Sequence, residues 1–391
     1  MTALAEPTVP ANTVTETSTE SGIPWMLYPI LASSAAIAIG LIWDISWHRT
    51  IGRDTFWSPP HVLEQLAAIV TGLVCGWVVL RTTFAGSSEE KATSVRFWGF
   101  RGPLGAWVCI WATLMMISSA PFDNWWHNAY GLDVKIISPP HMVLASGMIG
   151  IQLGAMLLAA AAQNRVTDEH TRRRLGYLYS VGAGIILAMA ATVIMEEGSM
   201  ANQMRSSAFY ILTGMVFPLV LVAAARGSGL KWSATIAALV YTVIQLAMIW
   251  TLQLFPATPM LAPIYNPVTH MVPPPFPLLV VFPAIAIDLL LRRWKWNDWL
   301  LAPVIGVAFV ALMVAVHWFW SAFLLTPAAR NWFFAADNWD YNVRLGPWRY
   351  QYWNVQTGGV LLQGVAKAAA YATISAAIGL LWGRGMAKVR R

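Results

Sequence analysis

Apolar residues fall in ten long runs that are separated by short polar stretches. Each run reaches or approaches the roughly 20 residues that a helix needs to cross the hydrocarbon core of a bilayer. The runs cover residues 24–47, 61–82, 103–121, 141–163, 175–195, 208–225, 232–254, 276–291, 299–322 and 358–383. The eighth run is the shortest, so it is expected to be tilted or partly re-entrant. The pattern predicts an all-α, polytopic integral membrane protein with about ten transmembrane helices.

The composition supports this fold class and excludes others. Of the 391 residues, 57% are hydrophobic and only 11% are charged, whereas soluble domains carry roughly 25% charged residues. A water-soluble core and a largely disordered chain are therefore excluded. The 22 Trp residues are typical of aromatic belts at membrane–water interfaces. Cys75 and Cys109 lie in apolar runs without CxxC spacing, so neither a disulfide nor a thiolate metal site is indicated.

The polar stretches predict the orientation. Residues 1–22 are rich in Thr and Glu and contain no Lys or Arg, which predicts a disordered tail. If this tail is cytoplasmic, most of the 25 Lys and Arg residues fall in loops on the cytoplasmic side. The net charge of +7 therefore reflects topology, and no nucleic-acid partner is expected. The chain is expected in the inner (plasma) membrane, with the lipid bilayer as partner and both termini in the cytoplasm.

Two outer hairpins repeat one pattern of acids and histidines. The first contains D-x3-H-x12-H and the second D-x3-H-x13-H, and both distal histidines follow Ser-Pro-Pro. The equivalent pairs are Asp44 and Asp123, His48 and His127, and His61 and His141. The first four helices are therefore expected to be two copies of one hairpin. This divides the chain into a tail (1–22), a four-helix unit (23–174) and a six-helix extension (175–391).

The spacing within each hairpin predicts a metal site at the outer membrane boundary. An acid and a histidine four residues apart project from one face of a helix. A Pro pair opens the following helix and places the distal histidine in its first turn. Two imidazoles and a carboxylate suit copper, zinc or non-haem iron. A single D-x3-H could equally cap a helix, and it is the repetition that favours metal binding.

The first hairpin resembles the C subunit of the particulate methane and ammonia monooxygenases. The matching residues are Asp44-Ile45-Ser46-Trp47-His48, Arg53-Asp54-Thr55, Pro59 and His61. The resemblance implies that Asp44, His48 and His61 bind a catalytic copper ion. That family has a second copper site with N-x3-H-x13-H spacing, to which Asp123, His127 and His141 are similar, with Asp123 in place of Asn. The resemblance covers only residues 40–150.

The resemblance implies a component that activates O2 to hydroxylate a small apolar or ammonia-like substrate, with electrons from a quinol or similar donor. Its partners would be other monooxygenase subunits or further copies of this chain. The unmatched six C-terminal helices favour an alternative, a copper-handling protein without oxygenase activity. Asp54 and Glu64 are candidates for groups that orient the ligands, although Asp54 could instead pair with Arg49 or Arg53. The aromatic segment 325–357 is expected to form a cap near the metal sites.

Overall fold

The computed structural model describes residues 22–131, 138–195, 198–294, 297–353 and 359–391. The predicted tail 1–22 lies outside these ranges except for Gly22. Helices account for 72% of the chain, and the all-α prediction is confirmed. Within the described residues, nine helices are long and apolar enough to cross a membrane. These are α1 (Leu27–Thr50), α2 (Pro59–Ala85), α4 (Leu104–Tyr130), α5 (Pro139–Gln163), α6 (Glu169–Met195), α7 (Ser207–Gly227), α8 (Ser233–Leu252), α10 (Asp298–Leu324) and α11 (Gly359–Met386).

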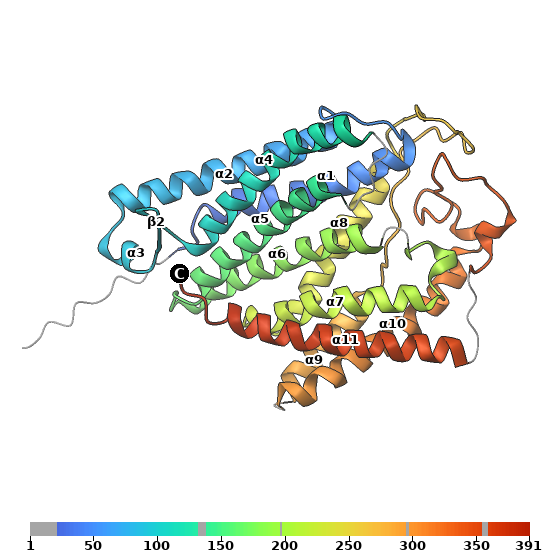
Figure 1. Ribbon diagram of the computed structural model, residues 1–391. Helices are drawn as coiled ribbons and strands as arrows, with labels where there is room; N and C mark the ends of the chain where they lie inside the picture. Colours follow the sequence, from blue (N-terminus) through green and yellow to red (C-terminus); the bar gives the residue numbers. More distant parts are fainter. Residues whose placement is uncertain (1–21, 132–137, 196–197, 295–296, 354–358) are drawn as a thin grey trace, which may run out of the picture.

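The helices lie side by side along a common axis (Figure 1). Both ends of the described chain lie at one end of the bundle, called here the terminal end (Figure 1). The opposite end, called the site end, carries the loops that follow α1 and α4. Short elements complete the fold: α3 (Ser88–Ala92), β1 (Val95–Phe97), β2 (Phe100–Gly102), η2 (Ala201–Gln203), η3 (Pro327–Ala329) and η4 (Pro347–Tyr350).

The eighth apolar run forms a shorter helix than the other nine. Its helix α9 (Val281–Arg293) has 13 residues, and residues 271–278 before it have no regular secondary structure. The segment nevertheless crosses the bundle. The backbone N–H of Val272 donates to Oγ1 of Thr50 at the end of α1 (2.8 Å). Further along, the Asp288 carboxylate accepts hydrogen bonds from the backbone N–H groups of Ala234 and Thr235 (3.1 and 2.8 Å), which begin α8 at the terminal end.

Proline explains why an extended backbone is tolerated at this depth. Backbone N–H and C=O groups need partners wherever water is absent, and four of the residues from 271 to 278 are Pro, which have no N–H to satisfy. The carbonyl of Pro277 accepts a hydrogen bond from the Tyr241 hydroxyl of α8 (2.7 Å). Met271, Val272 and Phe276 are at most 6% exposed, so protein rather than lipid surrounds the segment. Residues 271–293 therefore form the tenth crossing.

The two repeated hairpins are neighbours in the bundle. Helix α1 packs on α2, α2 packs on α4, and α4 packs along the length of α5. Gly147 and Gly154 of α5 face α4 so closely that an added Cβ would lie within 3 Å of α4 backbone or side-chain atoms. Small residues bring membrane helices into this kind of close contact. This contact holds the second hairpin together, and the packing of α2 on α4 makes the two hairpins neighbours.

Candidate metal centre

Helix α1 presents the first two site residues at the site end. It runs through Thr50, so Asp44 and His48 lie one turn apart, as predicted. Gly52 follows with a φ of +79°, a conformation that glycine adopts without strain and that turns the chain away from the helix. The second hairpin repeats this device, because Gly131 follows α4 with a φ of +96°. Each Gly lies four residues after its histidine.

The connection between α1 and α2 is held by its own hydrogen bonds. The backbone N–H of Thr55 donates to Oγ of Ser58 (2.9 Å), and the N–H of Ser58 donates to the Thr55 carbonyl (2.9 Å). The Trp47 indole donates to the Arg53 carbonyl (3.0 Å). Helix α2 then begins at Pro59, as the Pro pair predicts, and His61 lies in its first turn. The loop between them carries Asp54.

Four side chains meet here and form what we call the first cluster: Asp44, His48, Asp54 and His61. Nε2 of His61 lies 3.0 Å from Oδ1 of Asp44 and 3.6 Å from Oδ2 of Asp54. Nε2 of His48 lies 3.8 Å from Oδ1 of Asp44 and 3.6 Å from Oδ2 of Asp54. Ligand atoms that share one tetrahedral ion at about 2.1 Å are about 3.4 Å apart. Asp44, Asp54 and His61 therefore have the spacing of a metal-binding site, and His48, whose Nε2 lies 3.6 and 3.8 Å from the two carboxylates, is at its edge.

The orientation of His61 also fits a cation. Its Nδ1 lies 2.9 Å from the carbonyl oxygen of Thr55, and because a carbonyl only accepts, Nδ1 must carry a hydrogen and donate it. Nε2 of the same ring then faces the Asp44 carboxylate. Two lone pairs at 3.0 Å repel each other unless a proton or a metal ion lies between them. Metal-binding histidines are oriented by such a bond from their other nitrogen.

The first cluster lies in an excess of negative charge. Asp44 and Asp54 have no Lys or Arg ion pair within the described part of the chain. Glu64, one turn after His61, is only 2% exposed, and it interacts electrostatically with Asp44 and His61. Oδ1 of Asp44 and Oε1 of Glu64 are buried without a hydrogen-bond partner. The partner that faces this Asp44 oxygen is Nε2 of His61 at 3.0 Å, a contact that a proton on Nε2 or a bound cation makes favourable.

The second hairpin forms a smaller group, the second cluster, from Asp123, His127 and His141. Nε2 of His127 lies 3.3 Å from Oδ2 of Asp123, and Nε2 of His141 lies 3.6 Å from Oδ1. Nδ1 of His127 lies 3.2 Å from the Gly131 carbonyl. The ring is therefore held as His61 is, with Nε2 toward a carboxylate. Asp133, the repeat equivalent of Asp54, lies outside the described residues.

Asp54 is the member of the first cluster whose role the sequence left open. The expected pairing of Asp54 with Arg49 or Arg53 is wrong: Arg49 binds Asp340 (Nε to Oδ1, 2.6 Å), and within the described residues Asp54 pairs with His48 and His61. Ligand atoms of Asp44, Asp54 and His61 all lie within 4.8 Å of one another. One feature of the sequence points to Asp54 as a member of the cluster. It lies six residues after His48, and Asp133 lies six residues after His127 in the second hairpin.

The aromatic outer segment covers the end of α1 next to the first cluster. The N–H of Tyr341 donates to the carbonyl of Arg49 (3.1 Å), and the Tyr341 ring fills the space that a Cβ on Gly52 would need. Burial, and then the nearby Asp340 carboxylate, raise the pKa of the Tyr341 phenol above its usual value, so it stays neutral. The described part of this segment, to residue 353, therefore forms a cap that fixes α1 one turn beyond His48.

Two other histidines lie apart from these clusters. His270 is exposed in the loop before the tenth crossing, and its Nδ1 lies 3.0 Å from Oγ1 of Thr269. His317 is fully buried in α10 with Nδ1 3.3 Å from the Met313 carbonyl. Met204, whose thioether is of a kind that copper(I) favours, is 2% exposed within the apolar core. Glu196 and Glu197 lie outside the described residues.

Comparisons with protein-family models, with curated proteins and with solved structures give no match to this chain. The geometry of the two clusters is therefore the observation from which a function is argued.

Proposed function

We propose that this chain is a membrane-embedded metalloprotein that binds copper at the first and second clusters and acts as a component of a copper-dependent monooxygenase. One observation carries the proposal. In both hairpins a backbone carbonyl fixes Nδ1 of a histidine, so that Nε2 faces a carboxylate oxygen 3.0 or 3.3 Å away. A bound cation would make both contacts favourable, as a proton on Nε2 would, and copper accepts this mixture of imidazole and carboxylate ligands.

Each residue of the first cluster has a distinct part in this proposal. Asp44, His48, Asp54 and His61 would hold the ion, and the Thr55 carbonyl would keep His61 in the correct tautomer. Glu64, buried one turn after His61, would help to orient the ligands. When bound, copper would supply O2 activation for the oxidation of a small apolar or ammonia-like substrate. The electron donor, a quinol or similar molecule, and the other subunits would be separate.

A second candidate function is copper handling without oxidation. The side chains of His48 and Asp54 are 48% and 35% exposed, so part of the first cluster is open at the surface of the site end. Open ligands exchange a metal ion with a partner more readily than enclosed ones. Zinc or iron at the same ligands would give a third, structural role.

Metal analysis of the purified protein tests the binding proposal. We expect two copper ions per chain, and one ion in each of the variants His48→Ala and His127→Ala, because each removes one imidazole from one cluster. His170→Ala is the matched control, since His170 is exposed on α6 outside both clusters. Full metal content in both cluster variants would overturn the proposal. If the analysis finds zinc or iron instead of copper, the two metal sites are supported but the proposed copper monooxygenase is contradicted.

A second measurement separates the enzyme from the carrier. The copper-loaded protein in nanodiscs is given a quinol and a small hydrocarbon or ammonia, together with the other subunits if they copurify. O2 uptake that requires substrate and is lost in His61→Ala supports the monooxygenase. Rapid transfer of copper to a chelator, with no substrate-dependent O2 uptake, identifies the carrier.

A further inference from the structure

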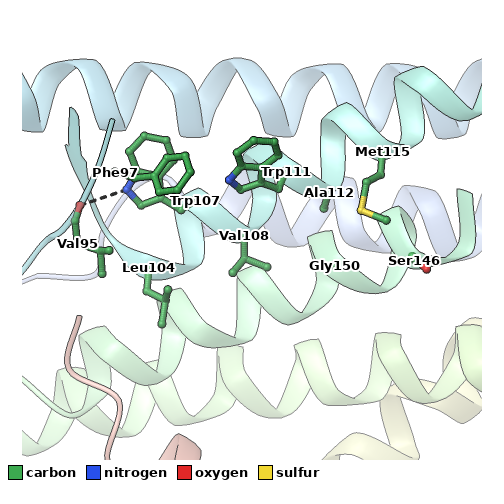
Figure 2. Close-up of a pocket in the computed structure, with 10 residues that line it drawn as sticks. All are labelled: Val95, Phe97, Leu104, Trp107, Val108, Trp111, Ala112, Met115, Ser146 and Gly150. Atoms are coloured by element: carbon green, nitrogen blue, oxygen red, sulfur yellow. Dashed lines mark hydrogen bonds between the residues drawn. The ribbon is translucent and has the colours of Figure 1, made fainter. Parts of the chain in front are cut away.

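An apolar groove lies on the surface of α4 and α5 in the half of the bundle near the terminal end. It has a volume of about 370 Å³. Its wall is the hairpin β1–β2 and the aromatic face of α4, and small residues of α5 form its floor (Figure 2). The lining residues are Val95, Phe97, Leu104, Trp107, Val108, Trp111, Ala112, Met115, Ser146 and Gly150.

A hydrogen bond and aromatic contacts hold the wall of the groove in place. The Trp107 indole donates to the Val95 carbonyl (3.2 Å) and fixes the hairpin against α4 (Figure 2). The ring of Phe97 lies 5.4 Å from that of Trp107 and 5.7 Å from that of Trp111. These edge-to-face and tilted contacts hold the wall in place. Ser146 and Gly150, with almost no side chain, leave the opposite side open.

The length of the groove matches one leaflet of a membrane. Its lining on α4 runs from Leu104 to Met115, eleven residues along the helix, which corresponds to about 16 Å. Half of a hydrocarbon core is about 15 Å thick. The groove starts at the hairpin, where the chain leaves the bundle at the terminal end, and finishes near mid-membrane. An extended acyl chain of one leaflet has this length and this apolar chemistry.

The positive charge at the hairpin indicates which headgroup accompanies the chain. Arg96 lies between Val95 and Phe97 on β1, is exposed, and has no ion pair within the described residues. Strand alternation turns Arg96 to the face of β1 opposite Val95 and Phe97, so it would meet a headgroup at the rim of the groove and not inside it. Arg101 is its cross-strand neighbour, and its Nη1 donates to the Lys91 carbonyl (3.0 Å). Such basic clusters at membrane level attract anionic lipids.

We propose that this groove is a phospholipid-binding site that holds one acyl chain of the leaflet at the terminal end, and that Arg96 and Arg101 give it a preference for an anionic headgroup. The site is independent of the metal clusters, which lie at the opposite end of the bundle. A bound lipid would cover Trp107 and Trp111 and brace the β1–β2 hairpin against α4.

Native mass spectrometry of the full chain in detergent, titrated with phosphatidylglycerol or phosphatidylcholine, tests the site. Ser146→Phe places a ring in the groove from an exposed position, and we expect one fewer tightly held phosphatidylglycerol than in the parent chain. Ser146→Leu should give a smaller loss. Arg96→Gln should lower the affinity for phosphatidylglycerol about tenfold and leave the affinity for phosphatidylcholine unchanged, so that the preference for an anionic headgroup is lost.

Ile149→Phe is the matched control, because Ile149 lies on the same helix, is 43% exposed and does not line the groove. It should keep the lipid count of the parent chain. Equal lipid counts for Ser146→Phe and Ile149→Phe would overturn the proposal. So would a change from dimer to monomer in Ser146→Phe without loss of lipid, because the groove would then be a contact between copies.

Discussion

Asp54 is the residue whose position most affects the chemistry of the first cluster. Its carboxylate faces Nε2 of both His48 and His61 at 3.6 Å, so it is placed to act as a fourth ligand. Asp54→Asn keeps the volume and removes the charge. We expect copper affinity at the first cluster to fall by about tenfold or more, measured by competition with a chelator at fixed pH. Unchanged affinity would show that Asp44, His48 and His61 bind the ion without Asp54.

The pH dependence of that affinity follows from the same residues. The carboxylates and imidazoles must lose their protons before they bind a metal ion. Copper affinity at the first cluster should therefore fall steadily as the pH is lowered from 7 to 5, with protons released on binding. Calorimetry in buffers of different ionisation enthalpy counts these protons. An affinity that is constant over this range would contradict imidazole ligation.

The spacing in the sequence predicted which residues of the first cluster share a helix face, because a helix fixes the separation of Asp44 and His48. It also placed His61 correctly, since Pro59 and Pro60 open a helix well. Asp54 was harder to assign because its place depends on how an eight-residue loop closes. That closure rests on the Thr55–Ser58 bonds and on Trp47, and no period in the sequence encodes such contacts.

At the scale of single elements, α9 depends on one buried carboxylate. Asp288 is 2% exposed and accepts from the first N–H groups of α8 and from the Thr235 hydroxyl (2.7 Å). Asp288→Ala leaves these donors unpaired, so we expect a loss of about 1–3 kcal/mol in the free energy of unfolding. Reversible denaturation in mixed micelles measures it. Asp288→Asn retains one acceptor and should therefore lose less stability than Asp288→Ala. Equal losses of unfolding free energy in the two variants would contradict a capping role.

The tenth crossing also shows what a hydropathy pattern does not distinguish. An apolar run of 16 residues, 276–291, predicts a tilted or re-entrant helix, but the structure starts the crossing five residues earlier, in Pro-rich chain. Hydropathy does not separate an extended proline segment from a helix, because both bury apolar side chains. The difference lies in the missing N–H groups of Pro, which become relevant only when neighbouring helices enclose the segment.

At the scale of the molecule, one ion pair connects the cap to the first hairpin across 291 residues of sequence. Arg49 is 7% exposed, and its Nε lies 2.6 Å from Oδ1 of Asp340. A double-mutant cycle with Arg49→Met and Asp340→Asn should give a coupling of about 1.5–3 kcal/mol in the free energy of unfolding. Both single variants should also weaken copper binding, because the cap fixes α1 one turn beyond His48. A coupling near zero would mean that Tyr341 and the backbone hold the cap without this pair.

The course of the tenth crossing decides the topology of the whole chain. By themselves, the nine helices of spanning length among the described residues would leave the two ends of the described chain on opposite sides of a membrane. A crossing by residues 271–293 would return them to the same side. Both native cysteines are buried, so introduced ones can be labelled selectively in intact cells with a membrane-impermeant maleimide. Trp57 at the site end is 76% exposed, and Met260 before the crossing is 70% exposed. We expect the variants Trp57→Cys and Met260→Cys to react with the maleimide. Arg293→Cys, exposed at the end of α9, should react only after permeabilisation, because the distribution of Lys and Arg predicts that the terminal end is cytoplasmic. Reaction of all three variants in intact cells would mean that residues 271–293 turn back within the membrane.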